Sequence, residues 1–180
     1  MTDPKYRGLI PRTISALYQE INNRYEKLIT VRVSYVEIYN ENLVDLLASD
    51  NNHESNQNLA IQEDPHHGVF VKGAMMPECP TDEEALAKLF EGETNRTISE
   101  HKLNKTSSRS HCIFTLHLET RSRVESSEKV VISKVNLVDL AGSERTKKTG
   151  IEGQTVMEAS FINKSLACLG QVVVALSEKE

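Results

Sequence analysis

The sequence predicts an α/β fold in which helices flank a mixed β-sheet, and three patterns support this prediction. Apolar residues spaced three or four apart, as in amphipathic helices, alternate along the chain with period-two stretches typical of strands. Two long strand-like stretches follow one another across a short charged connection, as in a hairpin. The second of these stretches ends in Asp139 and runs directly into a loop that contains Gly142.

The composition is that of a soluble globular chain. With 180 residues, 38% hydrophobic and 26% charged, it suffices for one domain or for a piece of a larger one. The longest apolar run, residues 172–176, is too short to span a bilayer, and no signal-type segment follows Met1, so we expect an intracellular protein without a membrane partner.

A net charge of −5 disfavours general nucleic-acid binding. The odd number of cysteines favours reduced, buried thiols over a disulfide framework: Cys79, Cys112 and Cys168.

The first half of the chain is expected to begin with a helix and a long strand. Residues 8–12 open the helix, which continues with three-and-four spacing to Tyr25. Residues 29–39 alternate as a strand with apolar residues on both faces at its end. Residues 42–48 are expected to form a short turn of helix, and a polar loop follows at residues 49–58.

Two short strands and a helix come next. The strands are expected at residues 59–63 and 68–73, and the adjacent His66 and His67 in their turn are read as solvated rather than as metal ligands. Beyond them, Thr81 and Glu84 form a capping box that starts a helix running to about Glu93 or beyond.

The second half contains the hairpin and the last helix. Residues 112–119 and 130–140 are the two strands, joined by residues 120–129. After a loop at residues 141–153, a helix carries apolar residues in regular three-and-four spacing from Val156 to Leu176.

Asp139 and Gly142 have the D-x-x-G spacing of a magnesium and phosphate sensor. An aspartate at the end of a buried strand holds Mg²⁺ through water, and a glycine three residues later offers an unobstructed N–H to a γ-phosphate. Taken alone the motif is weak, because a strand ending in aspartate is commonly only a turn.

Two motifs together carry a resemblance to a known family. The octad NKTSSRSH at residues 104–111 and LVDLAGSE at residues 137–144 resemble switch I and switch II of the kinesin motor domain. VSYVEIYN at residues 33–40 and INKSL at residues 162–166 also resemble kinesin signatures, and residues 90–96 are most similar to the ninth kinesin family. The resemblance covers nearly the whole chain. It implies a partial kinesin-type P-loop NTPase fold, with residues 1–180 as the central portion of the motor domain.

The resemblance implies a role for each polar residue of the nucleotide site. Asn104, Ser107 and Ser108 would close over the γ-phosphate of ATP and its Mg²⁺, with Ser108 nearest the metal. Asp139 would bind Mg²⁺ through water, and the Gly142 N–H would reach the γ-phosphate. The alternative for the serines is a hydroxyl-rich turn that caps a strand.

Two further groups are implied outside the phosphate contacts. Arg109 and Glu144 would form an ion pair between the switches that helps hold the attacking water; the alternative is a surface pair contributing about 0–1 kcal/mol. The case for a role of His111 in the nucleotide site is weaker, and this residue is interpreted as packed beside its strand.

Basic residues would touch the acidic microtubule surface, although a solvated charge run is the alternative. These residues are Arg145, Lys147, Lys148 and Lys164.

One family motif is missing from the 180 residues. None of the eight glycines belongs to a G-x-x-x-x-G-K-[ST] phosphate loop, which supplies the N–H cradle and lysine for the β- and γ-phosphates. We therefore expect the parent protein to be a microtubule-stimulated ATPase motor, whereas this chain alone binds ATP and Mg²⁺ weakly or not at all. We also expect an unpaired apolar strand edge, which would make the chain unstable, aggregating or paired.

Two other functions remain to be weighed. A non-catalytic microtubule-binding module derived from a motor is the alternative. A small GTPase is disfavoured because N-K-x-D is absent, since Asn163-Lys164-Ser165 is followed by Leu166. Family resemblance places the protein in the cytoplasm on the microtubule cytoskeleton, with the cilium or flagellum as a further candidate location.

Overall fold

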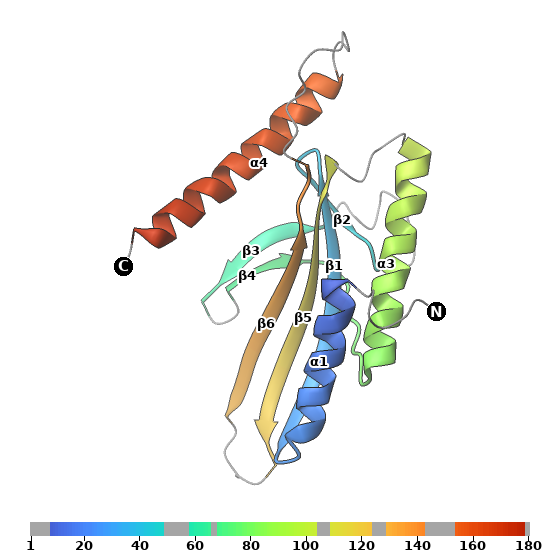
Figure 1. Cartoon of the computed structure of the whole chain (residues 1–180), viewed down its shortest axis with the longest axis vertical. Helices are drawn as coiled ribbons and strands as arrows, with labels where there is room; N and C mark the ends of the chain where they lie inside the picture. Colours follow the sequence, from blue (N-terminus) through green and yellow to red (C-terminus); the bar gives the residue numbers. More distant parts are fainter. Residues whose placement is uncertain are drawn as a thin grey trace.

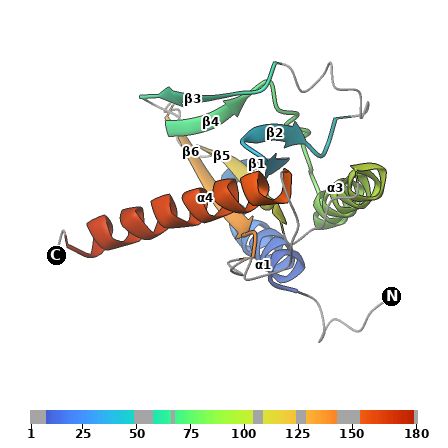
Figure 2. The ribbon, with the colours of Figure 1, turned by 90° about the horizontal axis from the view of Figure 1, so that it is seen from above.

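The computed structural model describes residues 8–48, 58–65, 68–103, 109–123, 129–142 and 154–178. A four-stranded antiparallel sheet of order β2-β1-β5-β6 carries two helices on one face and a separate β3–β4 hairpin on the other (Figures 1 and 2). The α/β fold class is therefore confirmed. The elements are α1 (Leu9–Asn23), β1 (Lys27–Tyr39), β2 (Asn42–Asp45), β3 (Ala60–Asp64), β4 (Gly68–Lys72), α3 (Asp82–Leu103), β5 (His111–Ser122), β6 (Val130–Asp139) and α4 (Gln154–Ser177).

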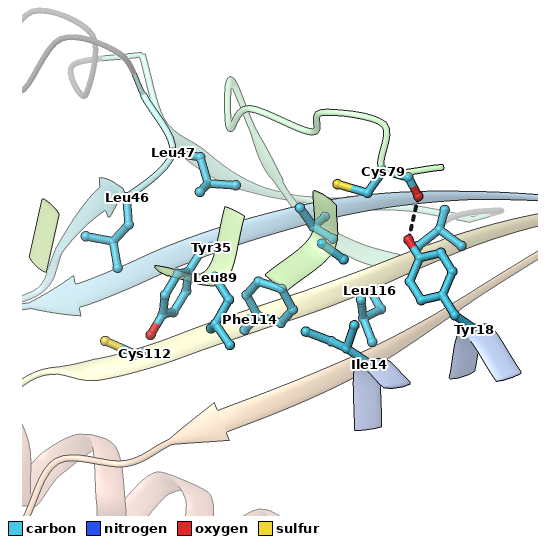
Figure 3. Close-up of a cluster of buried hydrophobic side chains, with 13 residues drawn as sticks. Ile14, Tyr18, Tyr35, Leu46, Leu47, Cys79, Leu89, Cys112, Phe114 and Leu116 are labelled. Atoms are coloured by element: carbon cyan, nitrogen blue, oxygen red, sulfur yellow. Dashed lines mark hydrogen bonds between the residues drawn. The ribbon is translucent and has the colours of Figure 1, made fainter. Parts of the chain in front are cut away.

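The core lies between the sheet and helices α1 and α3. Alternation along β1 turns Val31, Val33 and Tyr35 toward the helices, as the period-two pattern predicts, and β5 contributes Phe114 from the same face. The rings of Tyr35 and Phe114 meet edge to face, with centroids 5.4 Å apart. Figure 3 shows this cluster and the hydroxyl of Tyr18 donating a hydrogen bond to the Cys79 carbonyl.

The expected helical turn at residues 42–48 is wrong, because the chain makes a strand there. Asn40 and Glu41 both have positive φ (51° and 63°), the conformation of a two-residue hairpin turn, so Asn42 pairs directly with Tyr39. The Asp45 carboxylate then accepts hydrogen bonds from the backbone N–H groups of Leu47 and Met75. These bonds fix a non-helical turn after β2, so the apolar residues beyond it pack as a corner of the core.

Helix α3 begins as predicted and reaches Leu103. The hydroxyl of Thr81 accepts the Glu84 N–H at 3.2 Å, which confirms the cap. The short strands β3 and β4 also form where expected, with Asp64 paired to Gly68. The predicted histidines in their turn, His66 and His67, lie outside the described residues.

Two features of the surface bear on later arguments. Strand β6 lies at the edge of the sheet and exposes several large apolar side chains, as expected for an unpaired edge. Cys79 and Cys112 are buried free thiols, but Cys168 is exposed, so the expectation of buried thiols fails for the third cysteine. The reason is the position of α4, which runs away from the sheet in both views (Figures 1 and 2).

Helix α4 is unusually apolar for an exposed helix. Its window Ser160–Ser177 has a mean hydropathy of 1.3 with none of it buried, so by length and composition alone it could cross a membrane. Val172, Val173 and Val174 are each more than half exposed. The short apolar run noted in the sequence therefore understates how apolar the whole helix is. Core helices of soluble proteins have the same property.

Candidate functional site

Asp139 is the last residue of β6 and marks one end of the sheet. It lies opposite Cys112 of β5, and its side chain is 63% exposed. Ala141 is buried in the loop that follows, and Gly142 is half-buried. An exposed carboxylate therefore stands beside a loop that is held against the sheet, but β6 is an exposed edge strand and not the buried strand that the D-x-x-G interpretation assumes.

Arg96 of α3 meets Asp139 from the interior. Its guanidinium lies 3.4 Å from the Asp139 Oδ2, 3.4 Å from the Ser110 Oγ and 4.0 Å from the Glu37 Oε1. Arg96 and Glu37 are only 7% and 2% exposed. Burial opposes the charge on Arg96, but the acidic groups around it outweigh that effect and raise its pKa. The buried, charged side chain of Arg96, on α3, thus contacts Ser110 just before β5 and Asp139 at the end of β6.

A second bond from α3 supports the same end of the sheet. The hydroxyl of Tyr35 donates a hydrogen bond to the Glu93 carboxylate, and burial, followed by this bond, raises the pKa of Tyr35. Asn95 also donates to the carbonyl of Leu46 at 2.7 Å. These contacts hold α3 rigidly over β1 and place Arg96 within reach of Asp139.

Sequence reasoning did not single out Arg96, Glu93 or Glu37. One signal could have found them: Glu37 shares its strand face with Val33 and Tyr35, so an acid is placed on the core side of β1. A buried carboxylate requires a partner. Glu93 and Arg96 are three residues apart on a helix, so both point to one side of it.

His111 joins the loop after Asp139 to α4. Its Nδ1 accepts the Ala141 N–H at 3.0 Å, and its Nε2 lies 2.7 Å from the Ser165 Oγ. Burial lowers the pKa of His111, although the nearby Asp139 opposes this. His111 is therefore packed, as expected, and it is also hydrogen-bonded on both ring nitrogens.

The described residues include part of the predicted site. Asp139 and Gly142 lie at the end of β6, and half-buried Arg109 precedes the Ser110 that Arg96 contacts. Lys164 lies on α4, where its Nζ is 3.8 Å from the Glu41 Oε2. The remaining predicted residues fall outside the described part of the chain: Asn104, Ser107, Ser108, Glu144, Arg145, Lys147 and Lys148.

The donor set at Asp139 suits a metal held mostly by a ligand. Carboxylate oxygen is a preferred partner of Mg²⁺, which keeps several waters and binds proteins through one or two carboxylates plus phosphates. Within the described residues, no group of three or more His, Cys, Asp or Glu side chains could hold a metal ion. Asp139 therefore fits a water-mediated contact to a nucleotide-bound ion rather than an all-protein cage.

A cavity of about 450 Å³ lies on the other face of the sheet, under the β3–β4 hairpin. Its walls are mainly apolar and include Val36, Ile38 and Val138 from the sheet and Val69 and Val71 from the hairpin. Asp139 and Gly142 do not line it. The end of β6 with Asp139 and Gly142 and this cavity are therefore separate features.

Comparisons with known proteins agree on one family. The family model described as the kinesin motor domain matches residues 1–180. The chain is 51% identical to kinesin-like protein KIF9 of Mus musculus and 51% identical to kinesin-like protein KLP1 of Chlamydomonas reinhardtii, in each case over 97% of this chain and 22% of the other. The structure of a fast kinesin superposes with a TM-score of 0.82 at 38% identity, over 99% of this chain and 49% of that one. The chain thus spans about a fifth of the length of these curated relatives.

Proposed function

The chain belongs to the kinesin motor domain family, and from this premise we propose that it forms the nucleotide-sensing centre of an ATP-driven microtubule motor. The observation that carries the proposal is the match of the family model across the whole chain. The end of β6 supports it independently, because Asp139 stands exposed there while buried Arg96 holds its other side.

In this proposal, Asp139 and Gly142 sense the nucleotide. Asp139 binds the Mg²⁺ of ATP through water, and the Gly142 N–H reaches the γ-phosphate. Asn104 and the hydroxyls of Ser107 and Ser108 close over the same phosphate, with Ser108 nearest the metal. When bound, Mg²⁺ neutralises charge on the phosphates.

A second set of residues responds to closure of the site. Arg109 and Glu144 pair across the two switches and orient the attacking water. Arg145, Lys147, Lys148 and Lys164 attract the acidic surface of the microtubule, and this attraction weakens as salt increases. Lys164 pairs at the surface with Glu41, a weak contact that a microtubule can replace.

For the 180-residue chain by itself we propose microtubule binding without ATP turnover. The G-x-x-x-x-G-K-[ST] motif that cradles the β- and γ-phosphates is absent from these residues. That observation favours a second candidate function, a non-catalytic microtubule-binding module. We expect the parent protein on cytoplasmic microtubules. Resemblance to the ninth kinesin family suggests the cilium or flagellum as the specific location. Tagging the parent protein in cells tests this location.

Nucleotide titration and microtubule co-sedimentation separate the candidates. We expect the chain to pellet with microtubules at low salt, to be released at high salt, and to leave ATP unhydrolysed. Lys164→Ala should weaken pelleting, whereas Lys88→Ala, a lysine in a surface pair with Glu91, should not. Microtubule-stimulated ATP hydrolysis by this chain would instead show a complete catalytic site, and no pelleting at any salt would contradict both candidates.

A further inference from the structure

The β3–β4 hairpin stands over the sheet on the face opposite α1 and α3 (Figure 2). Near the turn of the hairpin, the Lys134 ammonium of β6 donates a hydrogen bond to the Val69 carbonyl at 2.5 Å. Just beyond β4, the Met75 N–H donates to the Asp45 carboxylate at 2.6 Å. An isolated two-stranded hairpin is only marginally stable in water, so the stability of this one depends on what lies beneath it.

The cavity beneath the hairpin has the size and the walls of a ligand site. Its volume of about 450 Å³ falls within the range of about 300–1,000 Å³ that is typical of small-molecule sites. Val36, in its wall on β1, is 4% exposed, whereas Val138, in its wall on β6, is 52% exposed. The cavity is therefore closed over the centre of the sheet and open along β6.

A small set of polar side chains lines the same cavity, and none of the described lining residues is an acid. Within this set, Ser34 and His117 are bonded to each other at 2.9 Å, so both are satisfied without a ligand. The Thr115 hydroxyl donates to the Asn136 Oδ1 at 3.0 Å, so the group that Asn136 can offer to a ligand is its NH₂ donor. Lys134 lines the cavity two residues from Asn136 and on the same face of β6.

The charge at the opening of the cavity is positive. Lys134 and Asn136 are both exposed, and each presents N–H donors there. Burial, and then the charge of Lys134, lowers the pKa of His117 below about 6.5, so its imidazole is neutral at pH 7. The complementary ligand has one negative charge at the opening and an apolar body inside. A carboxylate meets this requirement, because its two oxygens can accept from an ammonium and an amide at the same time.

We propose that this cavity binds an alkyl carboxylate, with its apolar chain beneath the β3–β4 hairpin and its carboxylate at Lys134 and Asn136. The bound chain displaces water from the apolar walls and packs the hairpin onto the sheet. The site is independent of the proposed motor function, because Asp139 and Gly142 do not line the cavity. The competing occupant is α4 of the same chain, which is apolar and exposed.

Calorimetric titration of the full 180-residue chain at pH 7 tests the proposal with octanoate, decanoate and dodecanoate, each below the concentration at which it forms micelles. Each added methylene should tighten binding about fourfold until the cavity is full. The methyl ester of decanoate should bind about tenfold more weakly than the acid, because it keeps the chain but loses the charge-assisted hydrogen bonds. Equal affinities for acid and ester, or affinities that do not depend on chain length, would overturn the proposal.

Two lysine variants test the position of the carboxylate. Lys134→Met removes the charge but keeps a long side chain, so it should weaken decanoate binding about tenfold and leave binding of the methyl ester unchanged. The matched control is Lys88→Met, which changes a lysine on α3, on the other face of the sheet, where it pairs with Glu91. The control should alter neither affinity. If both variants weaken decanoate binding equally, net charge rather than the cavity governs binding, and the site is refuted.

A third variant and an exchange measurement locate the alkyl chain. Ala74→Phe places a ring in the cavity wall and should weaken binding of all three acids. In the unmodified chain, dodecanoate at four times its Kd should slow hydrogen–deuterium exchange in β3 and β4 about fivefold and leave α3 unchanged. Slower exchange in α4 instead would place the ligand on the exposed helix and refute the site. If no acid binds and β3 and β4 already exchange slowly in the free chain, the chain fills its own cavity and the proposal is overturned.

Discussion

Arg96 and Asp139 form an ion pair across the end of the sheet, with 3.4 Å between the arginine Nη1 and the aspartate Oδ2. The two ends of the pair differ in environment, because the arginine side chain is 9% exposed and the aspartate side chain 63% exposed. The buried end also faces Glu37, whose side chain is 3% exposed. An exposed carboxylate is thus oriented by a cation that water hardly reaches.

Replacing Arg96 by Met should destabilise the fold by about 3–5 kcal/mol, because it leaves the Glu37 carboxylate buried without its cation. Urea unfolding followed by circular dichroism measures the change. Arg24→Ala is the control, since its pair with Glu20 is exposed and contributes only about 0–1 kcal/mol. The double variant Arg96→Met with Glu37→Gln should recover part of the loss; if it is no more stable than Arg96→Met alone, buried charge is not the cause.

Two helix glycines should respond to alanine in opposite directions. A Cβ on Gly92 would overlap Cδ1 of the Tyr35 ring and lie 3.0 Å from Cε1, while a Cβ on Gly170 meets nothing within 4 Å. The Tyr35 ring is held by Glu93 and by Phe114, so it cannot move aside easily. Gly92→Ala should therefore cost about 1–3 kcal/mol. Gly170→Ala should stabilise by up to about 1 kcal/mol through helix propensity.

Thermal melts of the two alanine variants measure this difference. A rise in Tm for both would mean that α3 does not press on Tyr35 as the structure shows. A fall in Tm for both would mean that Gly170 of α4 is covered, contrary to its open surroundings.

His117 should make stability depend on pH. It lies between Arg32 and Lys134 in the sheet register, and its Nε2 is 2.9 Å from the Ser34 Oγ. Burial, and then the charge of Lys134, lowers its pKa below the ordinary value of about 6.5. The unfolded chain therefore binds a proton more readily than the folded one, so stability present above about pH 6.5 is lost as the pH falls toward the folded-state pKa.

The measurement compares urea unfolding of the unmodified chain and His117→Gln between pH 7.5 and pH 5. The unmodified chain should lose stability on acidification with a larger slope, the excess being at most about 1.4 kcal/mol per pH unit for one proton. Salt should reduce the slope only in part, because it screens the charge of Lys134 but leaves burial, the larger cause of the lowered pKa, unchanged. Equal slopes in the two proteins would show that His117 titrates normally in the folded chain.

Much of the fold could be predicted from local pattern, and the failures have a physical cause. Alternation identified the core face of β1 because a strand with period two allows only two faces. The prediction for the residues after Tyr39 fails, because an apolar run of a few residues looks the same in a strand and in a helix. The turn at Asn40 and Glu41, in which both residues have positive φ, decides between the two.

The sequence predicts those residues of the candidate site that lie close together along the chain. It does not predict those that meet only in the folded structure. Asp139 and Gly142 could be recognised because their spacing is local. Arg96 could not, because a charged residue on a helix is normally assigned to the solvent side, and only the packing of α3 on β1 brings it to Asp139. The link from His111 to Ser165 is similar, since two residues far apart in sequence meet through tertiary placement alone.

The edge of β6 should determine whether the chain stays monomeric. The strand pairs with β5 on one side, and no other described strand pairs with it on the other. Val131, Ile132 and Val138 are each at least half exposed. An apolar strand with free backbone groups along its edge is a template for association with a second chain. We therefore expect the 180-residue chain to associate as its concentration rises.

Val131→Lys should increase the monomer fraction, because a lysine on an edge strand opposes pairing with an identical edge. Sedimentation velocity over a concentration series measures the fraction directly. Leu9→Lys is the matched control: it also replaces an exposed apolar residue by lysine, but at the start of α1 and outside any strand. If both variants raise the monomer fraction equally, net charge governs association; if neither does, the β6 edge is not the contact surface, and the exposed apolar face of α4 becomes the next one to test.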